Sequence, residues 1–552
     1  MPRYAIGIDF GSLSARAVVM DLSDGKVVSS AVSEYAHGIM TDTLPNGIPL
    51  AVDWAVQLPQ DYLDSLSESV REAVRAAGVS PEDIAGIGLD VTASTMLPVD
   101  REAKPLCEDE RFSEDPNSYI KVWKHHAAQK YADLIEETAQ SSGSGLLDPF
   151  GGHISGEHFL PKAMQIAMES PGLYDSSFRL LEAGDWMVWK LTGKESRGYC
   201  AASFKTYYSE KNGDIPSSFF SSISPRLEDL SDKYPRNVLF PGDCAGTLTE
   251  EGAALLGLVP GIPVAAAGVD AHTTVYGCGV SRPGQFLMII GTSTCEMLLS
   301  DTESHVEGIS GVVYDSIFKD VYTYECGQSG IGDMFGWFAN NQVPSGYRKE
   351  AEERGLSVQQ YLTEKASALK PGENGIVALD WFNGVRSTLM DFSLSGVIAG
   401  LTTETSPEEI YRALLESTAF GCRKIIETLE PEGVRIDTLI ATGGIPHKNP
   451  LMMQIYADVM KRDVYIVDRD QTGSVGSAIM AAAAASGGFS SLAGLTEKYA
   501  MPFSTVYHPV AAASGVYDSL YRIYCDMYAF FGEKDSLLHR LKDIRKNSRE
   551  ND

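Results

Sequence analysis

The hydrophobic pattern at the start of the chain predicts a β-hairpin. Residues 4–10 (YAIGIDF) and 15–21 (ARAVVMD) are short runs rich in apolar and β-branched side chains, and a Gly-Ser-Leu-Ser segment at 11–14 separates them. Runs of this kind form strands, and a small polar segment between two of them is typical of a tight turn. A third such run, 26–35, is expected to extend the sheet.

Helical periodicity follows and alternates with further strand-like runs. Apolar residues recur at helical spacing from Tyr62 to Ala77, and a buried strand is expected at 84–90. Further along, Ser406-Pro-Glu-Glu409 has the composition of a helix start with a capping box. The tyrosines between 517 and 528 form a helical stripe that we interpret as core packing. Strands alternating with helices predict a mixed α/β fold.

The strand–turn–strand pattern of the N-terminus recurs in the second half. Residues 285–299 (QFLMIIGTSTCEMLL) again place a Gly/Ser/Thr segment, beginning at Gly291, between two apolar runs. Gly11 and Gly291 lie 280 positions apart, about half of the 552 residues. A chain of this length exceeds one ordinary hydrophobic core. We therefore predict two α/β domains, 1–280 and 281–552, each with its own hairpin.

The composition is that of an ordinary globular protein, but the charge is strongly one-sided. Hydrophobic residues make up 44% and charged residues 22%, which argues against widespread disorder. The 45 Lys and Arg against 74 Asp and Glu give a net charge of −29. So acidic a protein repels phosphate backbones and anionic lipids, and we expect no nucleic-acid and no membrane partner. Eight scattered cysteines without a CxxC pair, and a start without an apolar signal segment, favour a soluble, cytoplasmic protein.

Several common catalytic signatures are missing from the sequence. Neither Gly-Lys pair belongs to a Walker A loop, and no GxGxxG, GxSxG or HExxH occurs. The two Gly-hydroxyl turns remain. A tight turn exposes backbone N–H groups, and Ser or Thr hydroxyls add donors. One such turn is most often only a hairpin, but two equivalent turns predict a clamp for a phosphate chain.

Three further features bear on this interpretation. Asp9 is suited to hold Mg²⁺ directly or through water, and Arg16 supplies positive charge; the alternatives are a turn-capping Asp9 and a solvated Arg16. Asp270 follows the apolar run 263–269, which places its carboxylate either at the ligand-binding edge of a sheet or at a helix N-terminus. The Gly443-Gly444 pair either gives a flat ligand such as adenine close access or is an ordinary strand-to-helix loop.

Together these features resemble the nucleotide site of the actin/hexokinase-like ATPase fold (ribonuclease H-like), and within it the chain is similar to the FGGY family of carbohydrate kinases. The best local match is Gly396-x-Ile398-x-Gly400-Leu401, followed after seven residues by Glu409-Ile410-x-x-Ala413-Leu414-Leu415-Glu416. The resemblance runs from about residue 4 to about residue 490. It implies a two-domain α/β fold with an interdomain cleft, and ATP and Mg²⁺ as cofactors.

Narrower motifs resemble the ribulokinase subgroup, namely Asp90-Val-Thr-Ala-Ser-Thr95, Val122-Trp-Lys-His125, Phe150-Gly-Gly-His-Ile-Ser-Gly-Glu157 and Glu325-Cys-Gly-Gln-Ser-Gly-Ile-Gly-Asp333. This resemblance implies that Asp270 is the catalytic base and that Asp9 holds Mg²⁺. The implied sugar contacts are Ala93, Trp123, Lys205, Asp270 and Glu325. The implied ATP and phosphate contacts are Gly11, Ser12, Ser14, Arg16, Gly291, Thr292, Ser293, Gly330, Gly443, Gly444, Lys448 and Asn449. Cys326 departs from the small residue common at its position, and we interpret it as a packing substitution.

The implied reaction is the ATP-dependent phosphorylation of L-ribulose at its C5 hydroxyl to L-ribulose 5-phosphate, a step of L-arabinose catabolism. An alternative is a kinase of the same family for another ketose or polyol, such as D-ribulose, ribitol or D-xylulose. A sugar sensor without activity and a chaperone-like ATPase are alternatives from other functional classes. The implied partners are the small sugar and MgATP, and a homodimer is a further expectation.

Overall fold

The computed structural model describes residues 3–533 and 536–550 and divides the chain into two compact units. The first unit contains the chain up to Ser281, together with Val313–Thr323 and Gln471–Met501. The second contains Arg282–Val312, Tyr324–Asp470 and the chain from Pro502 onward. These units differ from a single division after residue 280 because segments 313–323 and 471–501 belong to the first unit.

A seven-stranded mixed sheet forms the centre of the first unit. Its strands are β1 (Tyr4–Phe10), β2 (Ser14–Asp21), β3 (Val27–Glu34), β5 (Ile84–Val91), β11 (Cys244–Thr247), β12 (Pro263–Ala265) and β13 (Gly268–Val269). The order is β11-β12-β5-β1-β2-β3, and β13 also pairs with β5. β1 runs antiparallel to β2 and parallel to β5, so the predicted N-terminal hairpin and the strand at 84–90 are confirmed.

Helix α1 (Pro59–Ala77) covers one face of this sheet, where it packs on β2 and β3. Its Tyr62 is fully buried, and the ring stacks on Phe10 and on Tyr35 with centroid distances of 5.8 and 4.9 Å. This is the helix that the spacing of apolar residues predicts between Tyr62 and Ala77. Aromatic stacking of this kind stabilises the fold by about 0.5–1.5 kcal/mol per pair, beyond the stabilisation that comes from burying the ring area.

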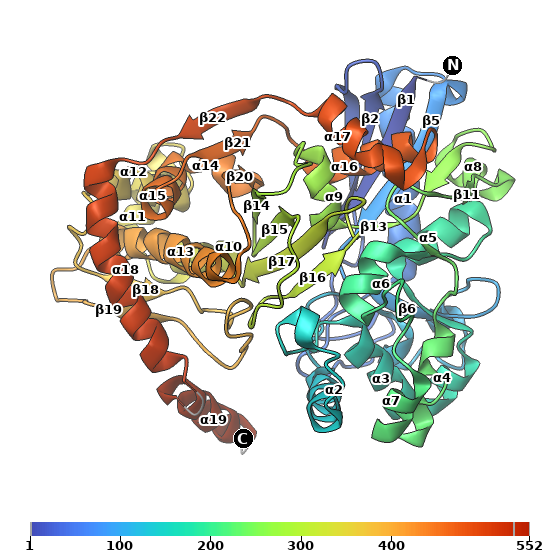
Figure 1. The fold of residues 1–552 in the computed structure, drawn as a ribbon, viewed down its shortest axis with the longest axis horizontal. Helices are drawn as coiled ribbons and strands as arrows, with labels where there is room; N and C mark the ends of the chain where they lie inside the picture. The colour runs from blue at the N-terminus through green and yellow to red at the C-terminus, as the bar shows by residue number, and fades with distance from the viewer. Residues whose placement is uncertain (1–2, 534–535, 551–552) are drawn as a thin grey trace. The chain divides into compact units, whose positions relative to one another are not determined.

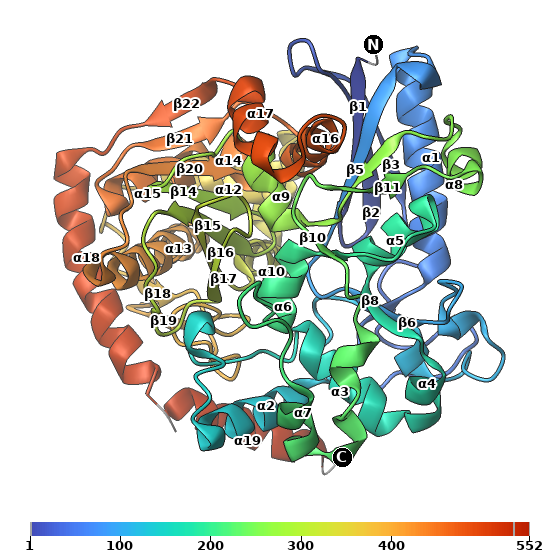
Figure 2. The ribbon, with the colours of Figure 1, turned by 45° about the vertical axis from the view of Figure 1, so that its right-hand side comes forward.

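Helix α16 (Thr472–Ala484) explains why segment 471–501 belongs to the first unit. It packs against β1, β5 and helix α9 (Asp270–Gly277), beside the sheet in both ribbon views (Figures 1 and 2). A Cβ on Gly7 would lie 1.8 Å from the Ser474 carbonyl oxygen, and one on Gly88 would lie 2.1 Å from the Ser477 carbonyl oxygen. Gly7 and Gly88 are neighbours across β1 and β5, so these side-chain-free positions let the helix backbone rest directly on the sheet.

The first unit also contains a second, smaller sheet. Its strands are β4 (Val56–Gln57), β6 (Met96–Val99), β7 (Ile120–Lys121) and β8 (Arg179–Glu182), in the order β4-β7-β6-β8. The other elements are β9 (Arg197–Gly198), β10 (Val238–Leu239), α2 (Gln129–Ser142), α3 (Phe159–Glu169), α4 (Pro171–Ser176), α5 (Ala183–Thr192), α6 (Tyr199–Thr206), α7 (Ser217–Ile223), α8 (Glu250–Leu256) and α17 (Leu492–Tyr499).

The second unit repeats the strand arrangement of the first. Its sheet has the order β16-β17-β15-β14-β20-β21-β22, formed by Gly311–Tyr314, Tyr322–Gln328, Thr294–Ser300, Gln285–Ile290, Thr438–Thr442, Val464–Val467 and Phe503–Tyr507. Residues 313–314 of β16 and 322–323 of β17 are grouped with the first unit. β14 is antiparallel to β15 and parallel to β20, as β1 is to β2 and β5. The predicted second hairpin is therefore confirmed, and each unit carries the same hairpin at the same place in its sheet.

Helices surround this second sheet, together with the short pair β18 (Val377–Leu379) and β19 (Val397–Ala399). The helices are α10 (Ile331–Asn341), α11 (Ser345–Glu353), α12 (Val358–Ser367), α13 (Pro407–Leu429), α14 (Gly444–Lys448), α15 (Pro450–Met460), α18 (Ala511–Phe531) and α19 (Leu537–Glu550). The capping box predicted at the start of α13 is present, because the Ser406 backbone N–H donates to the Glu409 carboxylate at 2.7 Å.

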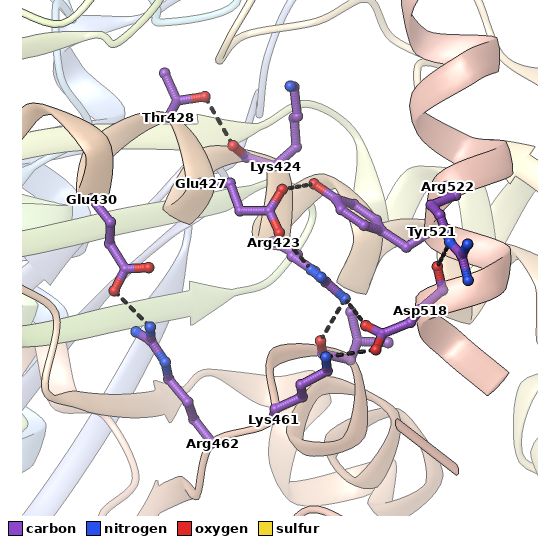
Figure 3. Close-up of polar contacts among 11 residues, drawn as sticks. Arg423, Lys424, Glu427, Thr428, Glu430, Lys461, Arg462, Asp518, Tyr521 and Arg522 are labelled. Carbon is purple, nitrogen blue, oxygen red and sulfur yellow. Dashed lines mark hydrogen bonds and ion pairs between the residues drawn. The ribbon is translucent and has the colours of Figure 1, made fainter. Parts of the chain in front are cut away.

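The tyrosine stripe lies on α18, which packs against α13 and α15. Tyr517, Tyr521 and Tyr524 are buried, as core packing requires. Nearer to solvent, ion pairs hold the helix in place: Arg423 of α13 and Lys461 both contact the Asp518 carboxylate, at 2.8 and 2.6 Å (Figure 3). Apolar and ionic contacts thus hold the same helix on two sides.

No single helix among the described residues is long and apolar enough to cross a membrane. The segments Thr472–Ala484 and Gly488–Tyr499 reach that length and hydropathy only as a pair, with a bend of 117°.

Candidate active site

Backbone and side-chain hydrogen bonds shape the turn of the first hairpin. The Gly11 N–H donates to the Ser14 carbonyl oxygen at 3.0 Å and closes the turn. The Gln57 amide donates to the Ser12 carbonyl oxygen at 2.9 Å, and the Trp123 indole N–H donates to the Ser12 hydroxyl at 3.0 Å. A hydroxyl that accepts one hydrogen bond keeps its own proton for another partner, so Ser12 is set to donate to an anion. The structure thus brings together Ser12 and Trp123, which the sequence assigned to different ligands.

Two aspartates face each other at the end of strands β1 and β5. Asp9 and Asp90 are direct neighbours in this parallel pair, and Asp9 also lies opposite Arg16 on β2. The Arg16 guanidinium is 4.0 Å from the Asp9 carboxylate, while about half of the Arg16 side chain is exposed. A backbone hydrogen bond, from Gly11 to Ser14, closes the turn that follows Asp9. The Asp9 carboxylate lies near the side chains of Arg16 and Asp90.

Asp270 joins this group from a third element. It begins α9 directly after β13, and Gly268 of β13 is the register neighbour of Asp90. Its carboxylate accepts a hydrogen bond from the Ala271 N–H at 2.7 Å. Asp270 therefore lies both at the end of a buried strand and at the first turn of a helix, so the two placements left open by the sequence occur together.

The electrostatics of these carboxylates follow from their burial. Burial raises the pKa of Asp9, although a hydrogen bond with Asp90 and the Arg16 charge oppose the shift. The pKa of Asp90 is raised further, first by burial and then by the negative charges of Asp9 and Asp270. Ser477 of α16 donates to Asp90 Oδ2 at 2.7 Å, but Asp90 Oδ1 is buried without a hydrogen-bond partner in the described chain.

This arrangement fits a divalent cation bound mainly by its substrate. No cluster of three or more acidic, His or Cys side chains in residues 3–533 and 536–550 is placed to hold a metal by itself. Mg²⁺ commonly takes only one or two protein carboxylates and fills its shell with phosphate and water oxygens. Asp9, together with the unpaired oxygen of Asp90, suits that role. The sequence interpretation named Asp9 but gave Asp90 no function, although Asp90 ends an apolar strand as Asp9 and Asp270 do.

The remaining sugar-site candidates of the first unit lie around the strand that leads to Asp270. Ala93, half-buried, packs with Cys200, Ala201 and Val269. Lys205 is buried on α6, the helix that contains Cys200 and Ala201 and packs against β13. Glu325 belongs to the second unit, where it lies buried on β17 and its carbonyl oxygen accepts from the Ser310 N–H at 2.9 Å.

The second hairpin turn is held by the start of helix α10. The Gly291 N–H donates to the Ser293 carbonyl oxygen at 3.0 Å, as Gly11 does in the first turn. The Gly332 N–H donates to the Thr292 carbonyl oxygen at 2.8 Å, and the Gly330 N–H donates to the Ser293 hydroxyl at 3.1 Å. Gly330 has a φ of 67° and precedes the 11-residue helix. Donor groups of a turn and of a helix N-terminus therefore lie together, as anion binding requires.

The glycine pair lies beside this hairpin in the same sheet. β20 is the parallel neighbour of β14, and Gly443 follows β20 directly. Gly443 has a φ of 104°, and a Cβ there would lie 2.4 Å from the Ile290 carbonyl oxygen, so this position requires glycine. Gly444 is exposed, and a Cβ built there would meet no atom within 4 Å. The pair thus gives a ligand access to bare backbone.

Lys448 and Asn449 lie farther along the same segment. Lys448 is exposed at the end of the short helix α14. Asn449 is buried and caps α15, because its side-chain oxygen accepts from the Met452 N–H at 3.0 Å. The structure therefore assigns Asn449 a folding role as a helix cap. Its expected contact with ATP remains a prediction.

Comparison with known proteins gives family matches to both units. Residues 4–277 match the N-terminal domain model of the FGGY family of carbohydrate kinases, and residues 286–485 match the C-terminal domain model. The chain is 43% identical to a ribulokinase from Geobacillus thermodenitrificans, covering 99% of this chain and 98% of the relative. It is 40% identical to a ribulokinase from Mycolicibacterium smegmatis, covering 99% and 97%.

Solved structures of similar fold have much lower sequence identity. A xylulose kinase from Rhodospirillum rubrum superposes with a TM-score of 0.74 at 22% identity, covering 96% of this chain and 98% of that one. A glycerol kinase from Plasmodium falciparum with ADP gives a TM-score of 0.73 at 16% identity, covering 95% and 98%. At such identities the likeness shows the fold alone, and it confirms the predicted two-domain α/β architecture.

Proposed function

This chain belongs to the FGGY family of carbohydrate kinases, and we propose that it transfers the γ-phosphoryl group of MgATP to the C5 hydroxyl of L-ribulose. The products are L-ribulose 5-phosphate and ADP, as in L-arabinose catabolism. The family membership supports an ATP-dependent sugar kinase, and the full-length similarity to proteins named ribulokinase supports the choice of sugar. The observation that carries the proposal is the position of Asp270 beside Asp9 and Asp90 at the ends of adjacent strands.

In the proposed mechanism Asp270 is the general base. The C5 oxygen forms a bond to the γ-phosphorus while the bond from that phosphorus to the β-bridging oxygen breaks, and the hydroxyl proton passes to the Asp270 carboxylate. An ordinary aspartate, with a pKa of about 3.9, is too weak to deprotonate an alcohol in advance, so the proton moves late. This order suits the loose transition state of phosphoryl transfer, in which positioning and charge stabilisation dominate.

The other residues bind and orient the two substrates. In the first turn we assign phosphate contacts to Gly11, Ser12, Ser14 and Arg16; in the second, to Gly291, Thr292, Ser293 and Gly330. Gly443, Gly444, Lys448 and Asn449 complete the proposed nucleotide contacts. Asp9, with Asp90, is proposed to hold Mg²⁺, which would neutralise phosphate charge.

The sugar is proposed to contact Trp123, Lys205 and Glu325, and the small side chain of Ala93 leaves room for a five-carbon chain. Lys205 suits this task because it is buried, and a hydrogen bond to a sugar hydroxyl is stronger where water is excluded. We propose that the protein acts in the cytoplasm, and a homodimer is the assembly we expect. Size-exclusion chromatography with light scattering tests the homodimer.

The decisive experiment is coupled ADP release by the purified protein with MgATP. The sugars compared are L-ribulose, D-ribulose, D-xylulose, ribitol and glycerol, with a sample lacking sugar. Asp270→Asn is expected to lower kcat by about 10²–10⁴-fold, the usual contribution of general base catalysis. Asp64→Asn, an exposed aspartate on α1, is the matched control and should keep full activity.

Each alternative has its own outcome in this experiment. A higher kcat/KM with another sugar would keep the kinase and replace L-ribulose. Sugar binding without ADP release would favour a sensor, and ADP release that needs no sugar would favour a chaperone-like ATPase. Unchanged activity of Asp270→Asn would remove Asp270 from the mechanism.

A further inference from the structure

A buried polar chain connects helix α18 to the end of strand β17 within the second unit. The Tyr524 hydroxyl donates to Asp380 Oδ1 at 3.2 Å. The Gln328 side-chain amide donates to Asp380 Oδ2 at 2.9 Å and to the Thr418 carbonyl oxygen, also at 2.9 Å. Asp380 and Gln328 are 5% and 4% exposed, and Tyr524 is 1% exposed. Both carboxylate oxygens are therefore satisfied away from solvent by neutral donors.

A glycine on helix α13 leaves the space that this polar chain occupies. Gly421 lies on α13 one turn after Thr418, and a Cβ on Gly421 would lie 2.3 Å from the Gln328 amide nitrogen. That Cβ would also lie 3.0 Å from Asp380 Oδ2. Any larger residue would displace the pair. The glycine thus accommodates the contact between Gln328 and Asp380. Burying the Asp380 carboxylate costs desolvation free energy that apolar side chains in its place would not.

Gln328 occupies the last position of β17, directly before the turn that leads into α10. Its neighbour Gly327 is fixed as well, because the Ser387 N–H donates to the Gly327 carbonyl oxygen at 3.1 Å and the Gly327 N–H donates to the Ser387 hydroxyl at 3.2 Å. Two residues after Gln328, the Gly330 N–H donates to the Ser293 hydroxyl of the second hairpin turn. Only Ser329 separates the buried anchor from this phosphate-side contact.

We propose that Tyr524, Asp380 and Gln328 form a positioning chain that holds the turn at Ser329 and Gly330, and through it the Ser293 hydroxyl, in place for the nucleotide phosphates. None of the three contacts substrate in this role. The inference rests on the proposed use of the second hairpin for ATP. It assigns α18, which the sequence shows only as a tyrosine stripe, a part in nucleotide binding.

Ser329 and Gly330 lie in a turn, and Gly330 has a positive φ that glycine adopts easily among many other conformations. Such a turn keeps one geometry only if both ends are fixed. The β17 end is fixed by side chains from elements far away in sequence. Loss of one link should therefore loosen the phosphate donors without unfolding the unit.

Tyr524→Phe tests the proposal, because it removes one hydroxyl and leaves the buried ring. Tyr521→Phe is the matched control: Tyr521 lies on the same helix and is also buried, but its hydroxyl donates at 2.7 Å to Glu427, in the ion network on the α13 surface (Figure 3). We expect Tyr524→Phe to raise KM for MgATP about threefold to tenfold, the effect of one lost hydrogen bond. KM for L-ribulose should stay close to the wild-type value, and Tyr521→Phe should change neither KM. The melting temperature of Tyr524→Phe should fall by a few degrees, because Asp380 Oδ1 is left buried without its donor.

Three results would overturn the proposal. These are an unchanged KM for MgATP in Tyr524→Phe, an equal rise of both substrate KM values, and the same change in Tyr521→Phe. MgADP binding by calorimetry keeps this test separate from the proposed reaction. If the wild type phosphorylates none of the sugars, a weaker Kd for MgADP in Tyr524→Phe than in Tyr521→Phe still supports the chain, and equal Kd values refute it.

Discussion

Glu296 places a carboxyl group in the middle of the seven-stranded sheet of the second unit. Replacing Glu296 with Gln should stabilise the protein by an amount that increases as the pH rises. The residue lies on β15 opposite Met288, is 0% exposed, and has no hydrogen-bond partner for either carboxylate oxygen in the described chain. Burial raises the pKa of Glu296 to about 8, although the positive charge of Arg386 opposes the shift. The side chain is therefore mostly protonated in the folded protein at neutral pH.

The magnitude follows from the difference between the folded and unfolded pKa values. An unfolded glutamate titrates near its model value of 4.5, so the unfolded state releases the proton first as the pH rises. Below pH 4.5 both states hold the proton and no penalty arises. The penalty on folding is about 1 kcal/mol at pH 5 and about 3 kcal/mol at pH 7, and it stops growing above the folded pKa. Glu296→Gln has the same shape and no proton to release, so it escapes this penalty.

The assay is urea unfolding of wild type and Glu296→Gln at pH 5 and at pH 7, with the free energy of unfolding compared at each pH. The advantage of the variant should grow by about 2 kcal/mol between the two conditions. Glu432→Gln, which removes the same formal charge at an exposed position, should show no such growth. A difference that is independent of pH, or one that turns against the variant as the pH rises, would show that Glu296 is ionised in the folded state and would refute the reasoning.

Two further predictions concern packing and a buried ion pair. Gly476→Ala on α16 should lower the free energy of unfolding by about 1–3 kcal/mol, because its Cβ would lie 1.9 Å from the Thr273 carbonyl oxygen, whereas Gly494→Ala on α17 has open space and should be neutral or slightly stabilising. Thermal melting distinguishes the two, and an equal effect would contradict the close approach. Arg412→Leu should cost about 3–5 kcal/mol because Glu416, its buried partner at 2.8 Å, loses its ion pair and keeps the weaker hydrogen bond from the Tyr517 hydroxyl at 3.3 Å. Burial already raises the pKa of Glu416 to about 7, so the loss should be smaller at pH 5.5, where the carboxyl is protonated, than at pH 8; a pH-independent loss would argue against this origin.

The candidate site was partly readable because its elements are local. Glycine and hydroxyl residues between apolar runs indicate the hairpin turns at 11–14 and 291–294, and the structure contains both turns there. Asp270 was ambiguous because the end of a strand and the start of a helix share one position. The capping role of Asn449 was not predicted, because it depends on where helix α15 begins.

Asp90 and the chain from Tyr524 to Gln328 lay beyond sequence reasoning. Asp90 lies beside Asp9 only because β5 pairs with β1 in this register. Asp380 contacts Gln328, 52 positions away in the chain, and Tyr524, 144 positions away. Contacts of this kind depend on which surfaces bury one another, and no local propensity encodes them.

The sequence by itself determined the two hairpins, the mixed α/β class, the helix that begins at the Ser406 capping box and the family of kinases to which the chain belongs. These follow from turn chemistry, apolar spacing and motifs, whose causes act over a few residues. Tertiary structure alone decided that segment 471–501 joins the first unit. There, glycines on β1 and β5 admit the backbone of α16. Packing between residues hundreds of positions apart made that choice, because only the folded sheet presents the bare surface on which the helix rests.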